Sequence, residues 1–227
     1  MALEPPPIIA IADGLLWQAR AHRAPFAFAV GKLAAACRDH PWRAGLLLRQ
    51  HRLSVDDWLV ALEELQWLHD LGLVVGITAP AGTSRVSPLP QLTKLGVAWL
   101  QIPEQQGESW LADPEGVDQP GLRFAWARSC HELGGVQAAL AGGASWAMLS
   151  PVLATPSKPD VRPLGWAALA EASARYPHQI VALGGMDARA VGQALRAGAA
   201  GIAVVRAWQD QPLELAAAVT AALQHPL

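Results

Sequence analysis

The stretch from residue 180 to residue 208, IVALGGMDARAVGQALRAGAAGIAVVRAW, constrains the fold more than any other part of the chain. It contains two short apolar runs, Val181–Leu183 and Ile202–Val205, and a helical pattern can begin after each of them. Runs of this kind are typical of buried parallel strands, each followed by a loop and a helix. Two such units in series indicate the closing quarter of a (β/α)8 barrel.

The loop after the first of these runs has the features of an anion site. Gly184 and Gly185 allow backbone to approach a ligand without side-chain obstruction. Asp187 is placed to cap the next helix, and Gly198 is placed to end it. In this kind of barrel, the loops after strands 7 and 8 commonly bind phosphate, because free N–H groups and the helix dipole favour an anion. The sequence therefore predicts a phosphorylated small-molecule ligand.

Eight apolar runs predict the whole barrel, an α/β fold with a single (β/α)8 TIM barrel. The runs are Ile8–Ala12, Leu46–Leu48, Leu73–Ile77, Val97–Leu100, Leu122–Ala127, Trp146–Leu149, Gln179–Leu183 and Ile202–Val205. Helical patterns lie between them at Ser54–Asp70 (with a capping box of Ser54 and Asp57), Leu133–Ala141, Leu164–Arg175, Ala188–Ala197 and Leu213–Leu223. We interpret residues 13–44, with the run Phe26–Val30 and a helical pattern near Lys32–Arg38, as an elaborated first strand-to-helix connection.

Length and composition favour one domain, residues 1–227, because 227 residues of which 52% are hydrophobic suffice for one barrel. The net charge of −2 gives no electrostatic reason to expect nucleic acid or an anionic membrane as a partner. No apolar run is long enough to span a membrane, and Glu4 and prolines stand where a signal peptide carries positive charge. We therefore expect a cytoplasmic protein. Cys37 and Cys130 are too few for a disulfide framework.

A series of motifs follows in a fixed order along the second half. Ser129–His131 reads SCH, Gly142–Asp160 reads GGASWAMLSPVLATPSKPD, Pro163–Trp166 reads PLGW, and the segments ALGGM and GIAVVRAW come last. This order and spacing resemble the thiamine phosphate synthase/TenI superfamily, whose members are (β/α)8 barrels that handle thiazole phosphate. Within the superfamily, these motifs resemble the synthase-like domain often fused behind a Nudix hydrolase.

The resemblance implies a phosphorylated thiazole, or another thiamine-related small molecule, as ligand. It assigns the phosphate to Gly184, Gly185 and the backbone of Val205 and Arg206. It assigns a second anion or substrate group to Arg49 and His51 of the segment LLRQHRLS, and to Thr155, Ser157 and Lys158. His131 aligns with the family histidine and is the candidate general acid/base, since imidazole titrates near neutral pH.

The chain departs from the family at its acidic segments. A synthase displaces pyrophosphate and needs Mg²⁺ held by carboxylates. The first acidic segment falls within Val75–Ala81, which contains no acid, and the second falls at Trp99–Glu104, where only Glu104 is acidic. TenI-like proteins isomerise the thiazole phosphate without such a site. We therefore expect no metal and no cofactor, with Mg²⁺ required only if the chain is a synthase.

Three functions remain compatible with these residues, so the sequence does not decide whether the chain is an enzyme. The favoured one is TenI-like proton transfer of the thiazole tautomerase type. The alternatives are synthase coupling of an aminopyrimidine pyrophosphate to thiazole phosphate, and a non-catalytic homologue that binds a thiamine-related phosphate. A homo-oligomer is compatible with each. Two further alternatives stay open: Cys130 is a second candidate proton carrier, and Trp99 either packs in the core or stacks on a ligand ring.

Overall fold

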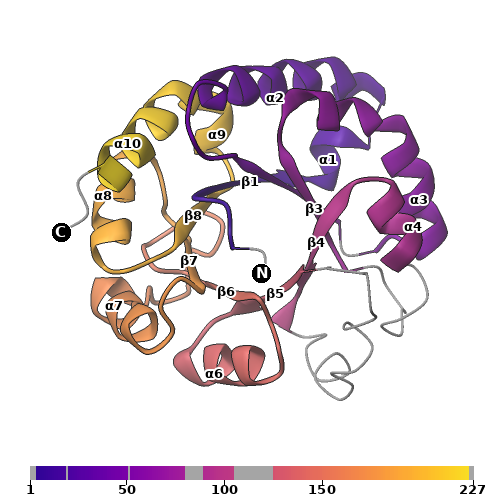
Figure 1. Ribbon diagram of the computed structural model, residues 1–227. Helices are drawn as coiled ribbons and strands as arrows, with labels where there is room; N and C mark the ends of the chain where they lie inside the picture. Colours follow the sequence, from indigo (N-terminus) through magenta and orange to yellow (C-terminus); the bar gives the residue numbers. More distant parts are fainter. Residues whose placement is uncertain (1–3, 19, 51, 80–88, 105–124, 225–227) are drawn as a thin grey trace.

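Eight parallel strands form a closed barrel in chain order, with helices around the outside (Figure 1). The structure is a computed structural model that describes residues 4–18, 20–50, 52–79, 89–104 and 125–224. The strands are β1 (Ile8–Asp13), β2 (Gly45–Arg49), β3 (Val74–Thr78), β4 (Val97–Ile102), β5 (Ala125–Cys130), β6 (Trp146–Leu149), β7 (Ile180–Leu183) and β8 (Gly201–Val204). The pairing of β1 with β8 closes the ring and confirms the predicted (β/α)8 fold.

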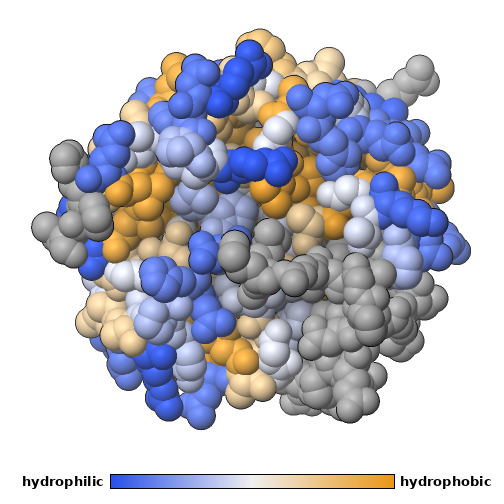
Figure 2. All heavy atoms as spheres, in the orientation of Figure 1, coloured by the Kyte–Doolittle hydropathy of each residue, from blue (hydrophilic) through white to orange (hydrophobic). Residues whose placement is uncertain are grey.

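The outer layer consists of helices that follow the strands. They are α1 (Gly14–Trp17), α2 (Arg23–Cys37), α3 (Val55–Glu64), α4 (Leu89–Lys94), α6 (Leu133–Ala141), α7 (Gly165–Arg175), α8 (Ala188–Arg196), α9 (Ala207–Asp210) and α10 (Pro212–Gln224), with 3-10 turns η1 (Arg20–His22) and η2 (Gln66–Leu71). Hydrophilic and apolar side chains are interspersed over the face in Figure 2. Among the described residues, no helix is both long enough and apolar enough to cross a membrane.

The predicted helix boundaries depend on capping residues, and the structure confirms these. Ser54 and Asp57 form a reciprocal capping box at the start of α3. The Asp187 carboxylate accepts hydrogen bonds from two backbone N–H groups at the start of α8. Gly198 follows that helix at φ 87°, a left-handed conformation that favours glycine. The local chemistry of the sequence therefore determines where these helices begin and end.

Three predicted boundaries were wrong. Strand β5 ends three residues later than the predicted run Leu122–Ala127, because Arg128 and Ser129 continue the strand although they are polar. Residues 122–124 of that run lie outside the described residues. The predicted helix Ser54–Asp70 ends at Glu64 and continues as η2. The run Phe26–Val30 lies within α2, which begins nine residues before Lys32.

The inside of the barrel is filled by side chains from alternate strand positions. Trp99 is fully buried there, with its ring centroid 5.8 Å from that of Trp146. It occupies the space beside Gly76, where a Cβ atom would lie 2.1 Å from the indole. Of the two alternatives for Trp99, core packing is therefore the one that the structure supports.

Candidate functional site

The inward positions become polar at the carboxyl ends of the strands. Asp13 at the end of β1 accepts two hydrogen bonds from the Arg49 guanidinium at the end of β2, at 2.5 Å from Nε and 2.7 Å from Nη2. The side-chain amide of Gln101 in β4 donates to the Ser129 hydroxyl in β5 at 3.0 Å. Functional sites of (β/α)8 barrels lie at this end. These polar side chains therefore identify the same end of the barrel as the candidate site.

A pocket of about 330 Å³ lies between the loops after β6, β7 and β8. It is lined by six of the residues that the sequence selected for anion binding: Thr155, Ser157, Gly184, Gly185, Val205 and Arg206. Two hydroxyl-bearing residues and an arginine therefore line the pocket together with the two glycines. The structure brings together residues that are up to 51 positions apart in the sequence.

The glycine pair is required by the close approach of the two loops. Gly184 and Gly185 have φ values of 93° and 69°, both in the left-handed region. A Cβ atom on Gly184 would lie 2.7 Å from the Pro151 Cα, and one on Gly185 would lie 2.5 Å from the Leu153 Cβ. Any side chain at either position would therefore displace the loop that carries Thr155.

His131 directly follows β5, and its ring contacts two residues of the loop after β6. Its Nδ1 lies 2.7 Å from the Ser150 carbonyl oxygen and 3.2 Å from the Ser150 hydroxyl. Its Nε2 lies 3.0 Å from the Lys158 Nζ. A carbonyl oxygen only accepts and an ammonium group only donates, so these partners fit the neutral ring with its proton on Nδ1. The lone pair of Nε2 then faces Lys158.

Glu104 is the acidic side chain of this cluster. Its Oε1 accepts a hydrogen bond from the His131 backbone N–H at 3.2 Å, and its Oε2 lies 3.6 Å from the His131 Nε2. Lys158 comes one residue after Ser157 of the anion pocket. The histidine therefore stands beside the pocket, between a cation and an anion.

Cys130 lies next to His131 in sequence but faces the other way. Its side chain is fully buried in the layer between barrel and helices, and its Sγ donates to the Arg128 carbonyl oxygen at 3.7 Å. Burial raises the pKa of this thiol to about 12; the Arg128 charge lowers it in part, and Glu104 adds to the rise. Cys130 is therefore a protonated packing residue near neutral pH, and the structure does not support the proton-carrier alternative.

The remaining predicted site residues are not placed in the pocket. The Arg49 guanidinium pairs with Asp13 and does not line the anion pocket. His51 lies outside the described residues. Sequence reasoning missed Asp13 and Ser150, although each is a polar residue at the end of a predicted strand, which is the signal that would have found them.

The described carboxylates at this end of the barrel do not fit a magnesium site. Asp13 is paired with Arg49, Glu104 contacts His131, and Asp187, which lines the anion pocket, caps α8. Within the described ranges, no group of three histidine, cysteine, aspartate or glutamate side chains is arranged to hold a metal ion.

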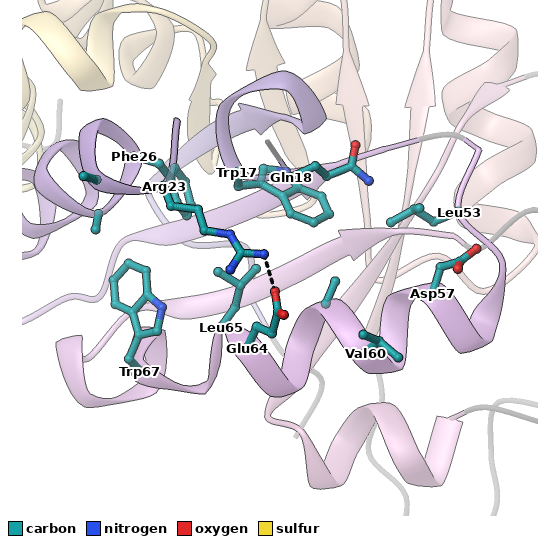
Figure 3. Close-up of a pocket in the computed structure, with 13 residues that line it drawn as sticks. Trp17, Gln18, Arg23, Phe26, Leu53, Asp57, Val60, Glu64, Leu65 and Trp67 are labelled. Carbon is teal, nitrogen blue, oxygen red and sulfur yellow. Dashed lines mark hydrogen bonds and ion pairs between the residues drawn. The ribbon is translucent and has the colours of Figure 1, made fainter. Parts of the chain in front are cut away.

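A second cleft, of about 620 Å³, lies outside the barrel wall between α2 and α3. Figure 3 shows the aromatic side chains of Trp17, Phe26 and Trp67 around it, and the ion pair between Arg23 and Glu64 that crosses it at 2.5 Å. Both charged groups are half-exposed and already paired. This cleft is larger than the anion pocket, but Arg23 and Glu64 are paired with each other and Asp57 belongs to the capping box of α3, so the site is assigned to the barrel end.

Comparison with known proteins points to the same half of the chain. Residues 124–208 match the family model described as thiamine monophosphate synthase. A putative thiamine-phosphate synthase of Geobacter sulfurreducens is 40% identical over 98 residues, 42% of this chain and 46% of that protein. A thiamine-phosphate synthase of Anaeromyxobacter dehalogenans is 38% identical over 102 residues, 44% and 46% of the two chains. The matches thus span less than half of these relatives.

Solved structures share the fold over the whole chain. A thiamine phosphate pyrophosphorylase from Pyrococcus furiosus superposes with a TM-score of 0.66, covering 95% of this chain and 96% of that one at 15% identity. A structure described as native KDPGal superposes almost as well, with a TM-score of 0.64 at 17% identity. At these identities the likeness concerns the fold alone. The family signal therefore comes from residues 124–208, which include His131 and most of the anion pocket.

Proposed function

We propose that this chain binds a thiazole phosphate of thiamine biosynthesis and moves a proton on it, in the manner of TenI-like thiazole tautomerases. The observation that carries the proposal is the neutral His131 ring, held at Nδ1 by Ser150 beside a glycine-lined anion pocket. A histidine of this kind is the usual general acid/base at neutral pH. The match of residues 124–208 to a thiamine monophosphate synthase model supports the choice of ligand.

In this proposal the phosphate group anchors the ligand. The pocket offers close backbone at Gly184 and Gly185, the hydroxyls of Thr155 and Ser157, and the Arg206 guanidinium. Anchoring one end fixes the position of the thiazole ring relative to His131, and such fixed geometry is a large part of what an enzyme supplies.

The proton acceptor is the Nε2 atom of His131. In the structure its lone pair accepts a hydrogen bond from the Lys158 ammonium. A bound phosphate group attracts that ammonium, and Lys158 then leaves Nε2 free to take a proton from the ring. Lys158 thus has two partners in turn, the histidine before binding and the anion afterwards.

Synthase coupling is the second candidate, because the matching family model and the relatives carry that name. Coupling needs Mg²⁺ on the leaving pyrophosphate. At the barrel end Asp13 contacts Arg49, Glu104 contacts His131 and Asp187 caps α8, which favours the metal-free reaction.

Two assays on the same preparation separate these candidates. The first follows a thiazole phosphate tautomer by NMR in D2O with EDTA, and we expect isomerisation with deuterium incorporation. The second supplies aminopyrimidine pyrophosphate, thiazole phosphate and Mg²⁺, and we expect turnover far below about 1 s⁻¹. Coupling at that rate or faster would overturn the proposal in favour of a synthase. Tight binding without either reaction would leave a non-catalytic binding protein.

A further inference from the structure

We infer that Glu104 is a positioning residue for His131, whose carboxylate holds the histidine backbone and balances the positive charge that the ring gains with a proton. The inference rests on the proposed function in one respect, namely that His131 takes a proton during turnover. The contact itself is observed independently of any substrate.

The two carboxylate oxygens of Glu104 contact the same residue at two places. Oε1 accepts from the His131 backbone N–H at 3.2 Å, which ties the residue after β5 to the segment after β4. Oε2 lies 3.6 Å from Nε2, longer than a hydrogen bond. At that distance the carboxylate attracts a charged ring without taking its proton. The proton on Nε2 therefore stays available for return to the substrate.

Glu104 is itself held from the neighbouring strand. Its backbone carbonyl accepts a hydrogen bond from the Arg128 Nη2 at 3.1 Å, and Arg128 is only 7% exposed. Ile102 of β4 pairs with Arg128 of β5 in the barrel register. The segment carrying Glu104 is thus fixed to the strand that carries His131, so the carboxylate and the imidazole keep their distance.

Glu104 stabilises the His131 ring when that ring is protonated, because Lys158 then no longer forms a hydrogen bond with it. The described charged groups near His131 are Lys158 after β6, Glu104 after β4 and Arg128 in β5. The neutral ring accepts a hydrogen bond from Lys158, but the protonated ring cannot, because both groups then only donate. Glu104 is the anion in this group, and it stabilises the protonated ring.

The proton balance needs no further reactant. A C–H or N–H bond of the thiazole breaks, its electron pair stays on the ring, and the proton forms an N–H bond at Nε2 of His131. The proton then returns to a different atom of the same ring. The step is an isomerisation, and nothing is oxidised or reduced.

The test replaces Glu104 by glutamine and by alanine, and measures isomerisation and, without any substrate, the hydrogen exchange of the His131 backbone N–H by NMR. Glutamine keeps an oxygen that accepts from the His131 N–H but carries no charge, whereas alanine removes both. We expect kcat for isomerisation to fall about tenfold in Glu104→Gln with KM nearly unchanged, because no carboxylate then stabilises the protonated ring. We expect the His131 N–H to exchange as in the wild type in Glu104→Gln and about tenfold faster or more in Glu104→Ala.

Glu132→Gln is the matched control. It removes the same charge from the exposed side chain that follows His131 in sequence. We expect the His131 N–H exchange and kcat of this variant to remain those of the wild type. Equal losses of kcat in Glu132→Gln and Glu104→Gln, or unchanged exchange of the His131 N–H in Glu104→Ala, would overturn the inference.

The two readouts also keep the inference distinct from the proposed function. Faster exchange of the His131 N–H in Glu104→Ala, in a protein that does not act on thiazole phosphate, would refute the function and leave the contact of Glu104 with His131 intact. Isomerase activity with unchanged exchange and unchanged kcat in the Glu104 variants would do the reverse.

Discussion

Replacing Gly185 by alanine perturbs the anion pocket at a single atom. The new Cβ would lie 2.5 Å from the Leu153 Cβ and 2.8 Å from the Ala154 carbonyl oxygen. Leu153 is also tied to the glycine pair, because its N–H donates to the Gly184 carbonyl oxygen at 3.0 Å. The loop of residues 153–155 must move, and with it the Thr155 hydroxyl that lines the pocket.

The expected loss in the free energy of unfolding of Gly185→Ala has two parts. A non-glycine residue in the left-handed region costs about 1–2 kcal/mol, and φ at Gly185 is 69°. Overlap in a packed region adds about 1–3 kcal/mol. Gly72 has φ 75° with no atom within 4 Å of an added Cβ, so Gly72→Ala has only the backbone cost of the left-handed conformation. We expect losses of about 2–5 kcal/mol for Gly185→Ala and about 1–2 kcal/mol for Gly72→Ala.

Urea denaturation and calorimetry with a thiazole phosphate test this reasoning. Gly185→Ala should bind the ligand at least about tenfold more weakly, a loss of about 1.4 kcal/mol, whereas Gly72→Ala should bind as the wild type does. Wild-type affinity in a folded Gly185→Ala variant would refute the placement of the anion. Equal stability losses in the two variants would refute the role of the loop contact.

Three further predictions concern stability. Ser54→Ala removes the capping box and should lower the free energy of unfolding by about 1 kcal/mol; an unchanged urea midpoint would contradict it. Burial raises the pKa of Cys37 to about 11 and that of Cys130 to about 12 from 9.0, so the unfolded chain loses these protons first as pH rises. Stability should therefore fall from about pH 9 upwards, and less so without the thiols. Arg23→Met should cost less than about 1 kcal/mol, because the partner Glu64 is half-exposed; a larger loss in 1 M salt would contradict this.

The sequence predicted the features that depend on neighbours along the chain. The capping groups Ser54 and Asp187 and the glycine pair act within a few residues, and all of them stand where they were expected. The end of strand β5 was misplaced because apolar patterning cannot recognise Arg128, which is buried and donates a hydrogen bond to the Glu104 carbonyl oxygen just after β4.

The candidate site was predicted only in part, because some of its contacts join residues that are far apart in the sequence. The anion pocket is lined by the loops after β6, β7 and β8, and the last two belong to successive strand-loop-helix units that the sequence predicted. The contacts of His131 with Glu104 and Lys158 each span 27 residues and arise only when the barrel closes. The pairing of Asp13 with Arg49 likewise depends on the register of β1 against β2.

The central claim is that His131 transfers a proton, and a single variant tests it most directly. His131→Asn keeps a side-chain donor that can reach the Ser150 carbonyl oxygen but has no titratable nitrogen. Single-turnover isomerisation of a thiazole phosphate is measured together with ligand affinity and melting temperature. The account predicts a rate loss of about 10²-fold or more, with affinity and melting temperature close to those of the wild type. An unchanged rate in the folded variant, or a lowered melting temperature with the rate per folded molecule preserved, would contradict it.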